Sequence, residues 1–477
     1  MHHSIRRTKI VSTLGPATSS AEQISELIDA GVDMFRLNAS HGTLEWHKER
    51  INIIKTLRKE LNKPIPIMFD IQGPKIRVGE LENGGPVELI EGQEICITPE
   101  CIKGTSKCIS TNYSNLSVDV APGNNILLDD GIFNLQVTAI EGKNVIAKVI
   151  AGGLLKERKG VNIPGSTGSL SAIGEKDQKD IAFAVENDVD YIAMSFVRSA
   201  NDIIHLKEYI KNSNGDIPVI AKIEKPEALD NIKDIINQSD GIMVARGDLG
   251  IELAPQKVPV AQKKLIKLAN KNNKFVITAT QMLESMVNNP LPSRAEASDV
   301  ANAIIDGTDA IMLSAETSVG KYPVKSVKTM GLIASEIESS KEVCIKNIIP
   351  EIQGDVSRDS HAISLSAVDM SKDLDPDAIV VFTNSGYSAR LISKFKPSIP
   401  VIAITHQQKV CNQLNICWSL KPYVLDIDSF DEEVLESINE LLKEKTFLNK
   451  GDTIILVGGM PFLVSGITNF IRICIIK

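Results

Sequence analysis

A lysine and two carboxylates follow two neighbouring apolar runs in the segment VIAKIEKPEALDNIKDIINQSDGIMVARGDLGIEL, residues 219–253. Lys222 and Glu224 stand at the end of the first run, and Asp248 stands just after the second. Two carboxylates can hold a hard divalent cation through their oxygens, and a nearby lysine can neutralise an anion. Gly247 lets backbone N–H groups approach a ligand closely. The segment predicts a site for a divalent cation and an anionic substrate, with a surface cluster of ion pairs as the alternative.

The elements that would position these groups recur along the chain as strand–helix units. Between the two apolar runs, Pro226 predicts the start of one helix, and the apolar positions at helical spacing are Leu229, Ile232 and Ile236. The expected strands are Lys9–Leu14, Met34–Asn38, Pro66–Ile71, Asp190–Phe196, Val219–Ile223, Gly241–Ala245, Phe275–Thr280 and Ala310–Ser314. Eight parallel strands that alternate with helices predict an α/β fold, a closed (β/α)8 TIM barrel.

Nearly every one of these strands ends in chemically reactive side chains. The strand-end residues are Arg36, Asn38, Ser40, Asp70, Ser195, Lys222, Glu224, Arg246, Asp248, Thr280, Gln281, Ser314 and Glu316. Only a closed barrel brings the carboxyl ends of all its strands to one mouth, whereas an open sheet would spread them along an edge. No GxGxxG turn follows the first strand, which weakens a dinucleotide-binding interpretation.

The sequence pattern changes twice along the chain. From about residue 74 to 170, short alternating runs such as Val145–Ile150 predict an inserted antiparallel β domain. Strand patterns of a separate α/β domain follow at Ala378–Thr383, Pro400–Thr405 and Thr453–Gly458. We expect a first barrel part at 1–72, an inserted domain at 73–170, a second barrel part at 171–344 and a C-terminal domain at 345–477.

The composition restricts the class of protein. The chain has 477 residues and a formal net charge of −8, so a basic footprint for nucleic acid is absent. Its seven cysteines form no CxxC pair, which favours a reduced, cytoplasmic protein. The first residues lack the apolar core of a signal peptide. Gly, Pro, Asn and Arg interrupt the apolar tail Thr453–Ile476, which predicts two buried strands rather than a membrane span.

Eleven blocks along the chain resemble the pyruvate kinase family, in order and at consistent spacing. The blocks are TKIVSTLGPA (8–17), FRLNASHG (35–42), DIQGPKIR (70–77), LLDDG (127–131), KGVNIPG (159–165), SFVR (195–198), AKIEKPEAL (221–229), MVARGDLGIEL (243–253), TATQMLESM (278–286), RAEASDVANAIIDGTDAIMLSAET (294–317) and YPV (322–324). The resemblance implies a barrel, an inserted small β-barrel lid and a C-terminal α/β regulatory domain. One departure is Ala39, where the family usually has phenylalanine.

The reaction implied by this resemblance transfers the phosphoryl group of phosphoenolpyruvate to ADP and gives pyruvate and ATP in glycolysis. Glu224 and Asp248 match the family's ligands for Mg²⁺ or Mn²⁺, which are hard oxygen donors. Lys222 matches the residue that stabilises the departing enolate, and Arg36 matches the residue that holds the transferring phosphoryl group.

The same resemblance implies how the rest of the substrate is held. The substrate carboxylate is expected at the backbone N–H groups of Gly247 and Asp248 and at the Thr280 hydroxyl. Thr280 and Ser314 match hydroxyls near the enolate carbon, and an ordered water is expected as the immediate proton donor.

Residues at the two junctions of the inserted domain match the family's nucleotide site. Arg77 and Lys159 are expected to clamp nucleotide phosphates when the lid closes; the alternative is that they only solubilise the hinge. Asn38 and His41 belong to the matched RLNASHG block as nucleotide-site candidates, and His41 could equally be a packed neighbour of the site.

A monovalent cation in many relatives lies near residues that correspond to Asn38, Ser40 and Asp70, with a threonine after the aspartate and a glutamate five residues beyond it. Here Ile71 follows Asp70, and Lys75 stands in the glutamate's place. A tethered ammonium can supply the positive charge that the ion otherwise brings. The resemblance is therefore to the potassium-independent branch, and activity is expected to need Mg²⁺ but not K⁺; the alternative is that Lys75 points into solvent.

A hydroxyl-rich turn follows the first strand of the C-terminal domain. Its residues are Thr383, Asn384, Ser385, Gly386 and Ser388. Backbone N–H groups and hydroxyls at a helix start can cradle a phosphate, and relatives bind phosphorylated activators here. Simple helix capping by serine is the alternative.

Two other functions compete with a cytoplasmic, homotetrameric pyruvate kinase. One is a Mg²⁺-dependent barrel lyase or aldolase acting on pyruvate or phosphoenolpyruvate, and the other is a catalytically inactive metabolite sensor. The inserted domain with its Arg77 and Lys159 argues against a lyase, which needs no nucleotide clamp. The intact strand-end residues argue against an inactive sensor. Expected partners are phosphoenolpyruvate, ADP, ATP, pyruvate and a phosphorylated activator, with no nucleic acid and no membrane.

Overall fold

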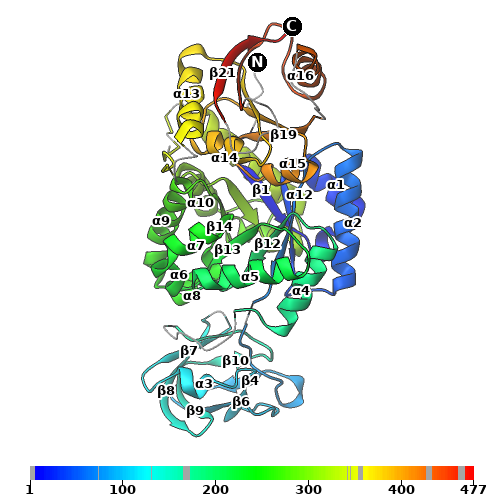
Figure 1. Ribbon diagram of the computed structural model, residues 1–477. Coiled ribbons are helices and arrows are strands. Elements are labelled where there is room, and N and C mark those ends of the chain that lie inside the picture. Colours follow the sequence, from blue (N-terminus) through cyan, green and yellow to red (C-terminus); the bar gives the residue numbers. More distant parts are fainter. Residues whose placement is uncertain are drawn as a thin grey trace.

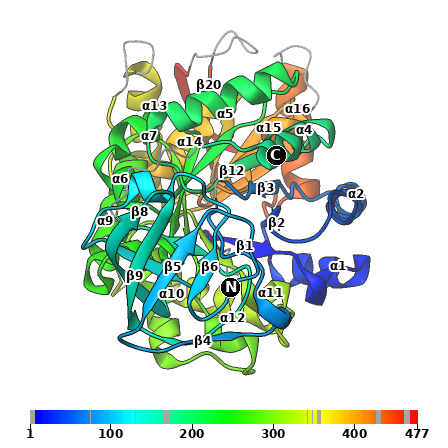
Figure 2. The same cartoon turned by 90° about the horizontal axis from the view of Figure 1, so that it is seen from below.

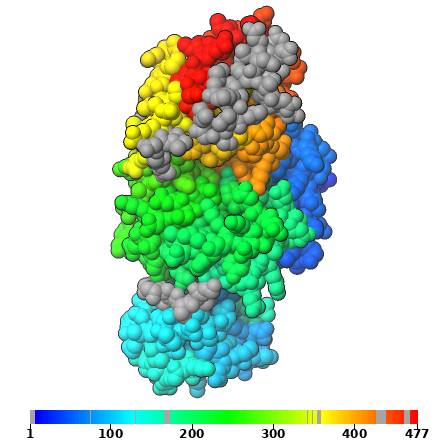
Figure 3. Space-filling model, in the orientation of Figure 1, coloured from blue at the N-terminus to red at the C-terminus, as the bar shows by residue number. Residues whose placement is uncertain are grey.

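The computed structural model describes residues 6–73, 75–129, 131–164, 172–340, 342–343, 345–346, 348–352, 358–425, 432–459 and 468–477. Figures 1 and 3 show three stacked domains, with the barrel in the middle, the inserted domain at one end and the C-terminal domain at the other. The inserted domain leaves the barrel after β3 (Ile67–Ile71). It therefore faces the carboxyl ends of the barrel strands, where the reactive side chains were predicted.

Eight parallel strands in the described residues close into a barrel, in the order β1-β16-β15-β14-β13-β12-β3-β2. Their bounds are β1 Lys9–Thr13, β2 Met34–Asn38, β3 Ile67–Ile71, β12 Tyr191–Met194, β13 Val219–Ile223, β14 Gly241–Ala245, β15 Phe275–Ala279 and β16 Ala310–Leu313. The predicted barrel is confirmed. The strand expected at 190–196 is shorter, because Phe196 has a φ of 55° and cannot extend a strand.

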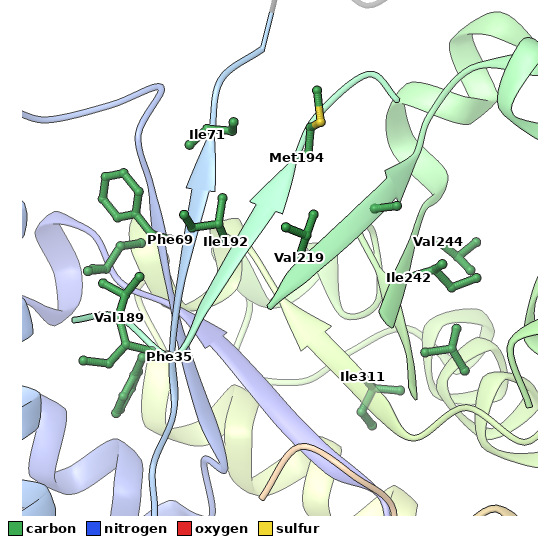
Figure 4. Packing of buried hydrophobic residues seen from close by; sticks show 14 of the residues in the cluster. Phe35, Phe69, Ile71, Val189, Ile192, Met194, Val219, Ile242, Val244 and Ile311 are labelled. Carbon is green, nitrogen blue, oxygen red and sulfur yellow. The ribbon is translucent and has the colours of Figure 1, made fainter. Parts of the chain in front are cut away.

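Side chains on each barrel strand alternate between the barrel interior and the surrounding helices. In Figure 4, Phe35, Phe69 and Ile242 from different strands belong to one buried apolar cluster. Their sequence neighbours Met34 and Met68 belong to the separate cluster that fills the interior. Burial on both faces is typical of parallel strands, and it explains why these segments are continuous apolar runs in the sequence.

Helices surround the barrel. Their bounds are α1 Ala21–Ala30, α2 Leu44–Glu60, α4 Glu175–Glu186, α5 Ala200–Asn212, α6 Pro226–Asp230, α7 Ile232–Gln238, α8 Arg246–Glu252, α9 Val258–Lys271, α10 Arg294–Ile305, α11 Ala315–Ser318 and α12 Pro323–Ser339. The prediction of one helix after Pro226 was wrong, because two short helices meet at Asn231. Asn231 leaves helical geometry, with a ψ of 11°, and its side-chain amide donates to the Arg198 carbonyl.

The inserted domain is a small β structure with its own core. Its elements are β4 Val87–Leu89, β5 Glu94–Thr98, β6 Cys108–Ser110, α3 Leu116–Asp119, β7 Asn125–Leu128, β8 Phe133–Glu141, β9 Asn144–Ala151, β10 Gly153–Leu155 and β11 Val161–Asn162. They form a sheet in the order β11-β7-β8-β9-β5-β6 and the pair β10-β4. Seen from below in Figure 2, the domain overlies part of the barrel end and leaves α1 and α2 outside its outline.

The C-terminal domain is an α/β sheet in the order β19-β18-β17-β20-β21. Its elements are α13 Arg358–Leu374, β17 Ala378–Phe382, α14 Tyr387–Lys394, β18 Val401–Thr405, α15 Gln408–Leu414, β19 Leu420–Val424, α16 Glu432–Lys445, β20 Thr453–Gly458 and β21 Phe470–Ile475. The tail forms two strands as predicted, but only β20 is buried, because β21 is a half-exposed antiparallel edge strand. None of the described helices has the length and apolar content that a membrane crossing requires.

Four aspartates at the amino end of the barrel stand just before alternate strands: Asp33, Asp190, Asp240 and Asp309. Each carboxylate accepts a 2.8 Å hydrogen bond from a backbone N–H of the preceding barrel strand, and the donors are Ile10, Ile67, Val219 and Val276. This end faces the C-terminal domain. There, Lys394 of α14 forms a buried ion pair with Asp309.

Candidate active site

Strand alternation brings three charged side chains to the barrel mouth. Arg36 lies two residues beyond Met34, and Asp70 lies two residues beyond Met68, on strands whose methionines fill the interior. Lys222 has the same relation to Ile220 on β13. Because residues two apart on a strand share a face, these charges lie above the apolar filling of the barrel.

Arg36 is fixed by two neighbouring strands. Its Nε and Nη2 atoms lie 2.7 and 2.6 Å from Asp70 Oδ2, and its Nη1 donates to Thr13 Oγ1 at 3.2 Å. Burial disfavours ionisation of Asp70, but Lys222 and Arg36 outweigh this effect and hold its pKa below the usual range. Arg36 still has unused N–H donors, since a guanidinium carries five. It is therefore a rigid cation that can bind a further oxyanion.

Lys222 is the centre of the network. Its Nζ lies 2.7 Å from Ser195 Oγ, 3.0 Å from Glu224 Oε1 and 3.3 Å from Asp70 Oδ2. Burial alone would lower the pKa of Lys222, but the Asp70 and Glu224 carboxylates reverse this effect and raise it. Lys222 therefore stays protonated at neutral pH and can stabilise negative charge, whereas it cannot act as a base.

Glu224 and Asp248 are candidates to hold a divalent cation. Burial raises the pKa of Glu224, Lys222 opposes this shift, and the nearby charge of Asp248 adds to it. In the described residues no group of three or more His, Cys, Asp or Glu side chains is placed to hold a metal ion. Mg²⁺ is commonly bound by one or two carboxylates together with substrate oxygens, so this pair of hard donors fits that ion.

Gly247 and Thr280 form the neighbouring part of the site. Thr280 Oγ1 accepts from the Gly247 backbone N–H at 2.7 Å and donates to the Ala279 carbonyl at 2.6 Å. The φ angles of Thr280 and Gln281 are 68° and 54°, a left-handed conformation that costs a β-branched residue free energy. Such strain clusters at functional sites.

Arg246 holds Thr280 in this strained conformation. Its Nη2 donates to the Thr280 carbonyl at 2.8 Å, and its Nη1 is paired with Asp299 at 2.7 Å. The sequence indicated Arg246 only as a reactive strand-end residue and did not indicate this positioning contact. Thr13, which accepts from Arg36, was missed, although it ends the first strand as the other site residues end theirs.

Ser314 directly follows β16 and carries a hydroxyl that is free to act. Its Oγ is buried and has no hydrogen-bond partner among the described residues. Glu316 accepts from the Ser314 backbone N–H at 2.7 Å and from the Leu283 N–H at 3.0 Å, which fixes the turn. A buried, unpaired hydroxyl can hold a water molecule or a substrate atom.

The residues of the predicted cation position are only partly assembled. Asn38 Oδ1 accepts from the Ser40 backbone N–H at 3.1 Å. Lys75 instead lies over Gly160, and no described carboxylate is within ion-pair distance of its ammonium group. Burial and the charges of Arg36, Arg77 and Lys75 lower the pKa of His41. These three cations therefore lie close enough to His41 for their charges to act on it.

The two junction residues bind their own domain. Arg77 Nη1 donates to the Arg158 carbonyl at 3.0 Å, and Lys159 Nζ lies 2.8 Å from Asp129 Oδ1. The two junction segments that carry them are linked by an isolated antiparallel bridge between Arg77 and Gly160. The hinge thus keeps both cations together on the inserted domain, and neither contacts a strand-end residue of the barrel through a hydrogen bond between described residues.

The turn before α14 is compact. Gly386 has a φ of 80°, which favours glycine, and the Thr383 backbone N–H continues the sheet ladder to Ile404. Asn384 accepts from Gln407 at 2.6 Å, Ser385 is exposed, and the buried Ser388 hydroxyl bonds to the Thr468 hydroxyl.

Comparisons with known proteins agree with this geometry. The family profile "Pyruvate kinase, barrel domain" matches residues 5–327, and "Pyruvate kinase, alpha/beta domain" matches residues 361–474. Pyruvate kinase 2 of Synechocystis sp. is 44% identical over 478 residues, covering 99% of this chain and 80% of that protein. The pyruvate kinase of Clostridium acetobutylicum is 42% identical, covering 99% and 100% respectively.

A solved structure leads to the same family. The crystal structure of a pyruvate kinase from Cryptosporidium parvum matches with a TM-score of 0.91 and 38% identity, covering 99% of this chain and 96% of that one. Fold, strand-end chemistry and sequence similarity therefore agree, and the chain belongs to the pyruvate kinase family, enzymes that transfer a phosphoryl group from phosphoenolpyruvate to ADP.

Proposed function

We propose that the network of Arg36, Asp70, Lys222 and Glu224 performs the phosphoryl transfer. The observation that carries this proposal is the position of Lys222, whose Nζ lies between the buried Asp70 and Glu224 carboxylates and 2.7 Å from Ser195 Oγ. Phosphoryl transfer needs positioning and neutralisation of charge more than covalent catalysis. Arg36 binds the transferring phosphoryl oxygens with its unused N–H donors, and Lys222 stabilises the enolate oxygen that is left behind.

Glu224 and Asp248 hold Mg²⁺, or Mn²⁺, in this proposal. When bound, the ion neutralises oxygens of the substrate and the transferring group. The Lys222 ammonium, 3.0 Å from Glu224, keeps that carboxylate oriented when no ion is present.

The substrate carboxylate binds at the start of α8, to the N–H groups of Gly247 and Asp248 and to Thr280. The Gly247 backbone N–H already donates a hydrogen bond to the Thr280 hydroxyl oxygen. It therefore points toward the place proposed for an oxygen of the substrate carboxylate. The Thr280 proton is engaged by Ala279, whereas the Ser314 hydroxyl has no described partner. We therefore assign to Ser314 the water that protonates the enolate carbon, with Thr280 as the neighbouring hydroxyl.

ADP binds between the barrel mouth and the inserted domain. Arg77 and Lys159 clamp its phosphates, and Asn38 and His41 border the same space. The support is electrostatic, because the positive charges of Arg77, Lys75 and Arg36 all act on His41 and lower its pKa. Lys159 must leave its ion pair with Asp129 before it can bind the nucleotide phosphates.

Activity does not require K⁺ in this proposal. The position bordered by Asn38, Ser40 and Asp70 already contains the cations Arg36 and Lys222, both paired with Asp70. Lys75, from the adjacent junction, adds a third positive charge and repels a monovalent ion. On this ground we propose that the chain resembles the potassium-independent branch of the family.

Regulation is assigned to the C-terminal domain. The turn of Thr383, Asn384, Ser385, Gly386 and Ser388 binds a phosphorylated activator, and the protein is a cytoplasmic homotetramer. We propose the domain division at 1–72, 73–170, 171–344 and 345–477, of which the boundary residues 1, 170, 171 and 344 lie outside the described residues.

A coupled assay with phosphoenolpyruvate, ADP and Mg²⁺ tests the proposal. Equimolar pyruvate and ATP are expected. Conversion of phosphoenolpyruvate without ATP would instead indicate a lyase, and binding without turnover would indicate a sensor.

A further inference from the structure

Two chain segments connect the barrel with the inserted domain, and both meet at the first turn of α4. The outgoing segment follows β3 and contains Gly73, and the returning segment leads into α4 and contains Gly174. In Figure 1, α4 lies at the end of the barrel nearest the inserted domain. The first turn of α4 is therefore well placed to hold both connections.

Asp177, in this first turn, binds both segments. Its Oδ1 accepts a 2.9 Å hydrogen bond from the Gly73 backbone N–H, and its Oδ2 accepts a 2.9 Å hydrogen bond from the Gly174 N–H. Asp177 is only 2% exposed, so these bonds are shielded from water. One buried carboxylate thus joins two segments that only the fold brings together, since Gly73 lies 104 positions before Asp177 in the sequence.

The contact with Gly73 goes beyond what capping of a helix requires. The other bond is ordinary capping, because Asp177 is the third residue of α4 and accepts from the N-cap N–H. The same arrangement begins α5, where Asp202 accepts from the Ser199 N–H at 2.9 Å. The further donor to Asp202 is the neighbouring Arg198 N–H, at 2.8 Å. Asp202 therefore binds only the start of its own helix, whereas Asp177 also binds a segment that leads away from the barrel.

The outgoing segment lies against the strand-end network. Gly73 has a φ of 67°, which favours glycine, and a Cβ atom there would lie 3.0 Å from the Ser195 carbonyl oxygen. Ser195 Oγ in turn lies 2.7 Å from Lys222 Nζ. Arg77 follows Gly73 on the same segment. A displacement of Gly73 would therefore move Arg77 relative to the network.

Lys176, beside Asp177, holds a third segment. Its Nζ donates to the Ala39 carbonyl at 2.8 Å and lies 2.5 Å from Asp180 Oδ2. Ala39 directly follows Asn38, which borders the proposed nucleotide space. The first turn of α4 thus holds the two segments that carry Arg77 and Asn38.

We propose that Asp177 is a positioning residue, whose carboxylate fixes the outgoing segment, and with it the inserted domain, at the barrel mouth for nucleotide binding. This role rests on the position proposed above for ADP. Asp177 touches no substrate and acts through the Gly73 backbone. Without the carboxylate, the connecting segments remain paired inside the inserted domain, where the Val78 N–H donates to the Lys159 carbonyl at 2.8 Å. The inserted domain then keeps its fold but loses its fixed attachment to the barrel.

Trypsin cleavage of the full chain tests whether Asp177 holds the outgoing segment. Trypsin can cut after Lys75 and Arg77 when this segment opens locally. Asp177→Ala should be cleaved there about tenfold or more faster than the wild type, because the bond to the outgoing segment is lost. Asp202→Ala loses a helix cap of the same kind without touching this segment, and it should be cleaved there at the wild-type rate.

Steady-state kinetics with phosphoenolpyruvate, ADP and Mg²⁺ test whether this attachment serves the reaction. Asp177→Ala should raise the KM for ADP and lower kcat, each about fivefold or more, and should change the KM for phosphoenolpyruvate less than about twofold. Asp202→Ala should keep the wild-type constants. Asp177→Asn retains one acceptor oxygen and should fall between Asp177→Ala and the wild type, and it provides the test if Asp177→Ala does not fold.

Two results would overturn the role of Asp177. One is equal trypsin cleavage of the outgoing segment in Asp177→Ala and Asp202→Ala, and the other is a KM for ADP that is unchanged in both Asp177 variants. Arg77→Gln, measured in parallel, tests the proposed nucleotide clamp separately. If Arg77→Gln leaves the KM for ADP unchanged while Asp177→Ala raises it, the clamp by Arg77 fails and the positioning role of Asp177 stands.

Discussion

The Thr280 hydroxyl oxygen lies 2.7 Å from the Gly247 backbone nitrogen and accepts its hydrogen bond. This contact joins the ends of two neighbouring barrel strands at the place where a substrate carboxylate is expected. It depends on a strained Thr280, whose φ is 68° and whose carbonyl is held by Arg246. The site therefore keeps an oxygen in front of an N–H donor before any ligand arrives.

Thr280→Ala should lower turnover by about tenfold or more, because the substrate carboxylate loses a hydroxyl partner and Gly247 loses its acceptor. Thr280→Ser keeps the oxygen and should retain most of the activity. Steady-state kinetics of both variants provide the measurement. Equal losses in the two would mean that the methyl group and its packing matter, and not the hydroxyl.

Lys222→Met should reduce turnover by ~10²-fold or more and leave Mg²⁺ and phosphoenolpyruvate binding largely intact, since its charge acts in the transition state. Lys225→Met, in which a lysine paired with Glu252 is changed instead, is the matched control. Turnover and direct binding of substrate are both to be measured. Near-normal turnover with weakened binding would contradict the assigned role.

Potassium should have little effect on the wild-type enzyme, because Arg36 and Lys222 already pair with Asp70, and Lys75 stands where many relatives have a glutamate. Activity is measured in tetramethylammonium buffer stripped of K⁺ and Na⁺, and KCl is then added at constant ionic strength. Lys75→Glu should make the enzyme respond to KCl. A rise of about tenfold or more in the wild type would refute the prediction.

Replacing Thr383, Ser385 and Ser388 by alanine should leave basal activity unchanged and abolish activation by phosphorylated effectors, because the cradle loses its hydroxyl donors. Ser388 is buried against Thr468, so the double variant Thr383→Ala/Ser385→Ala guards against simple destabilisation. Activity is titrated with sugar phosphates and nucleoside monophosphates. If activation persists in both variants, the effector site must lie elsewhere in the protein.

Stability should depend on pH through Lys9. Burial lowers its pKa from 10.5 to about 7, and Asp33 only partly opposes this shift. Between these pH values the unfolded lysine carries a proton that the folded one has lost, so the free energy of unfolding should rise with pH. Urea unfolding from about pH 7 to about pH 10 measures this slope, which Lys9→Met should make less steep and the exposed-site control Lys59→Met should leave unchanged.

The barrel could be predicted because its strands are buried on both faces and end in polar residues. The grouping of Arg36, Asp70 and Lys222 also followed from sequence, since strand alternation fixes which residues share a face. The helix break at Asn231 could not be predicted, because it depends on the tertiary hydrogen bond to Arg198.

Other features depend on contacts between segments that are distant in the sequence. The positioning contact of Arg246 requires the positive φ of Thr280, for which the residue type gives no signal. The location of Lys75 over Gly160 depends on how the inserted domain folds back at its hinge.

The four aspartates at the amino end of the barrel link β1 with β2, β3 with β12, β13 with β14, and β15 with β16. The other four pairs of neighbouring strands in the barrel are not linked by such a carboxylate among the described residues. The cylinder is thus a fourfold repeat of strand pairs. Partial opening should separate one pair from the next, and the amide protons of Ile10, Ile67, Val219 and Val276 should be among the slowest to exchange with solvent.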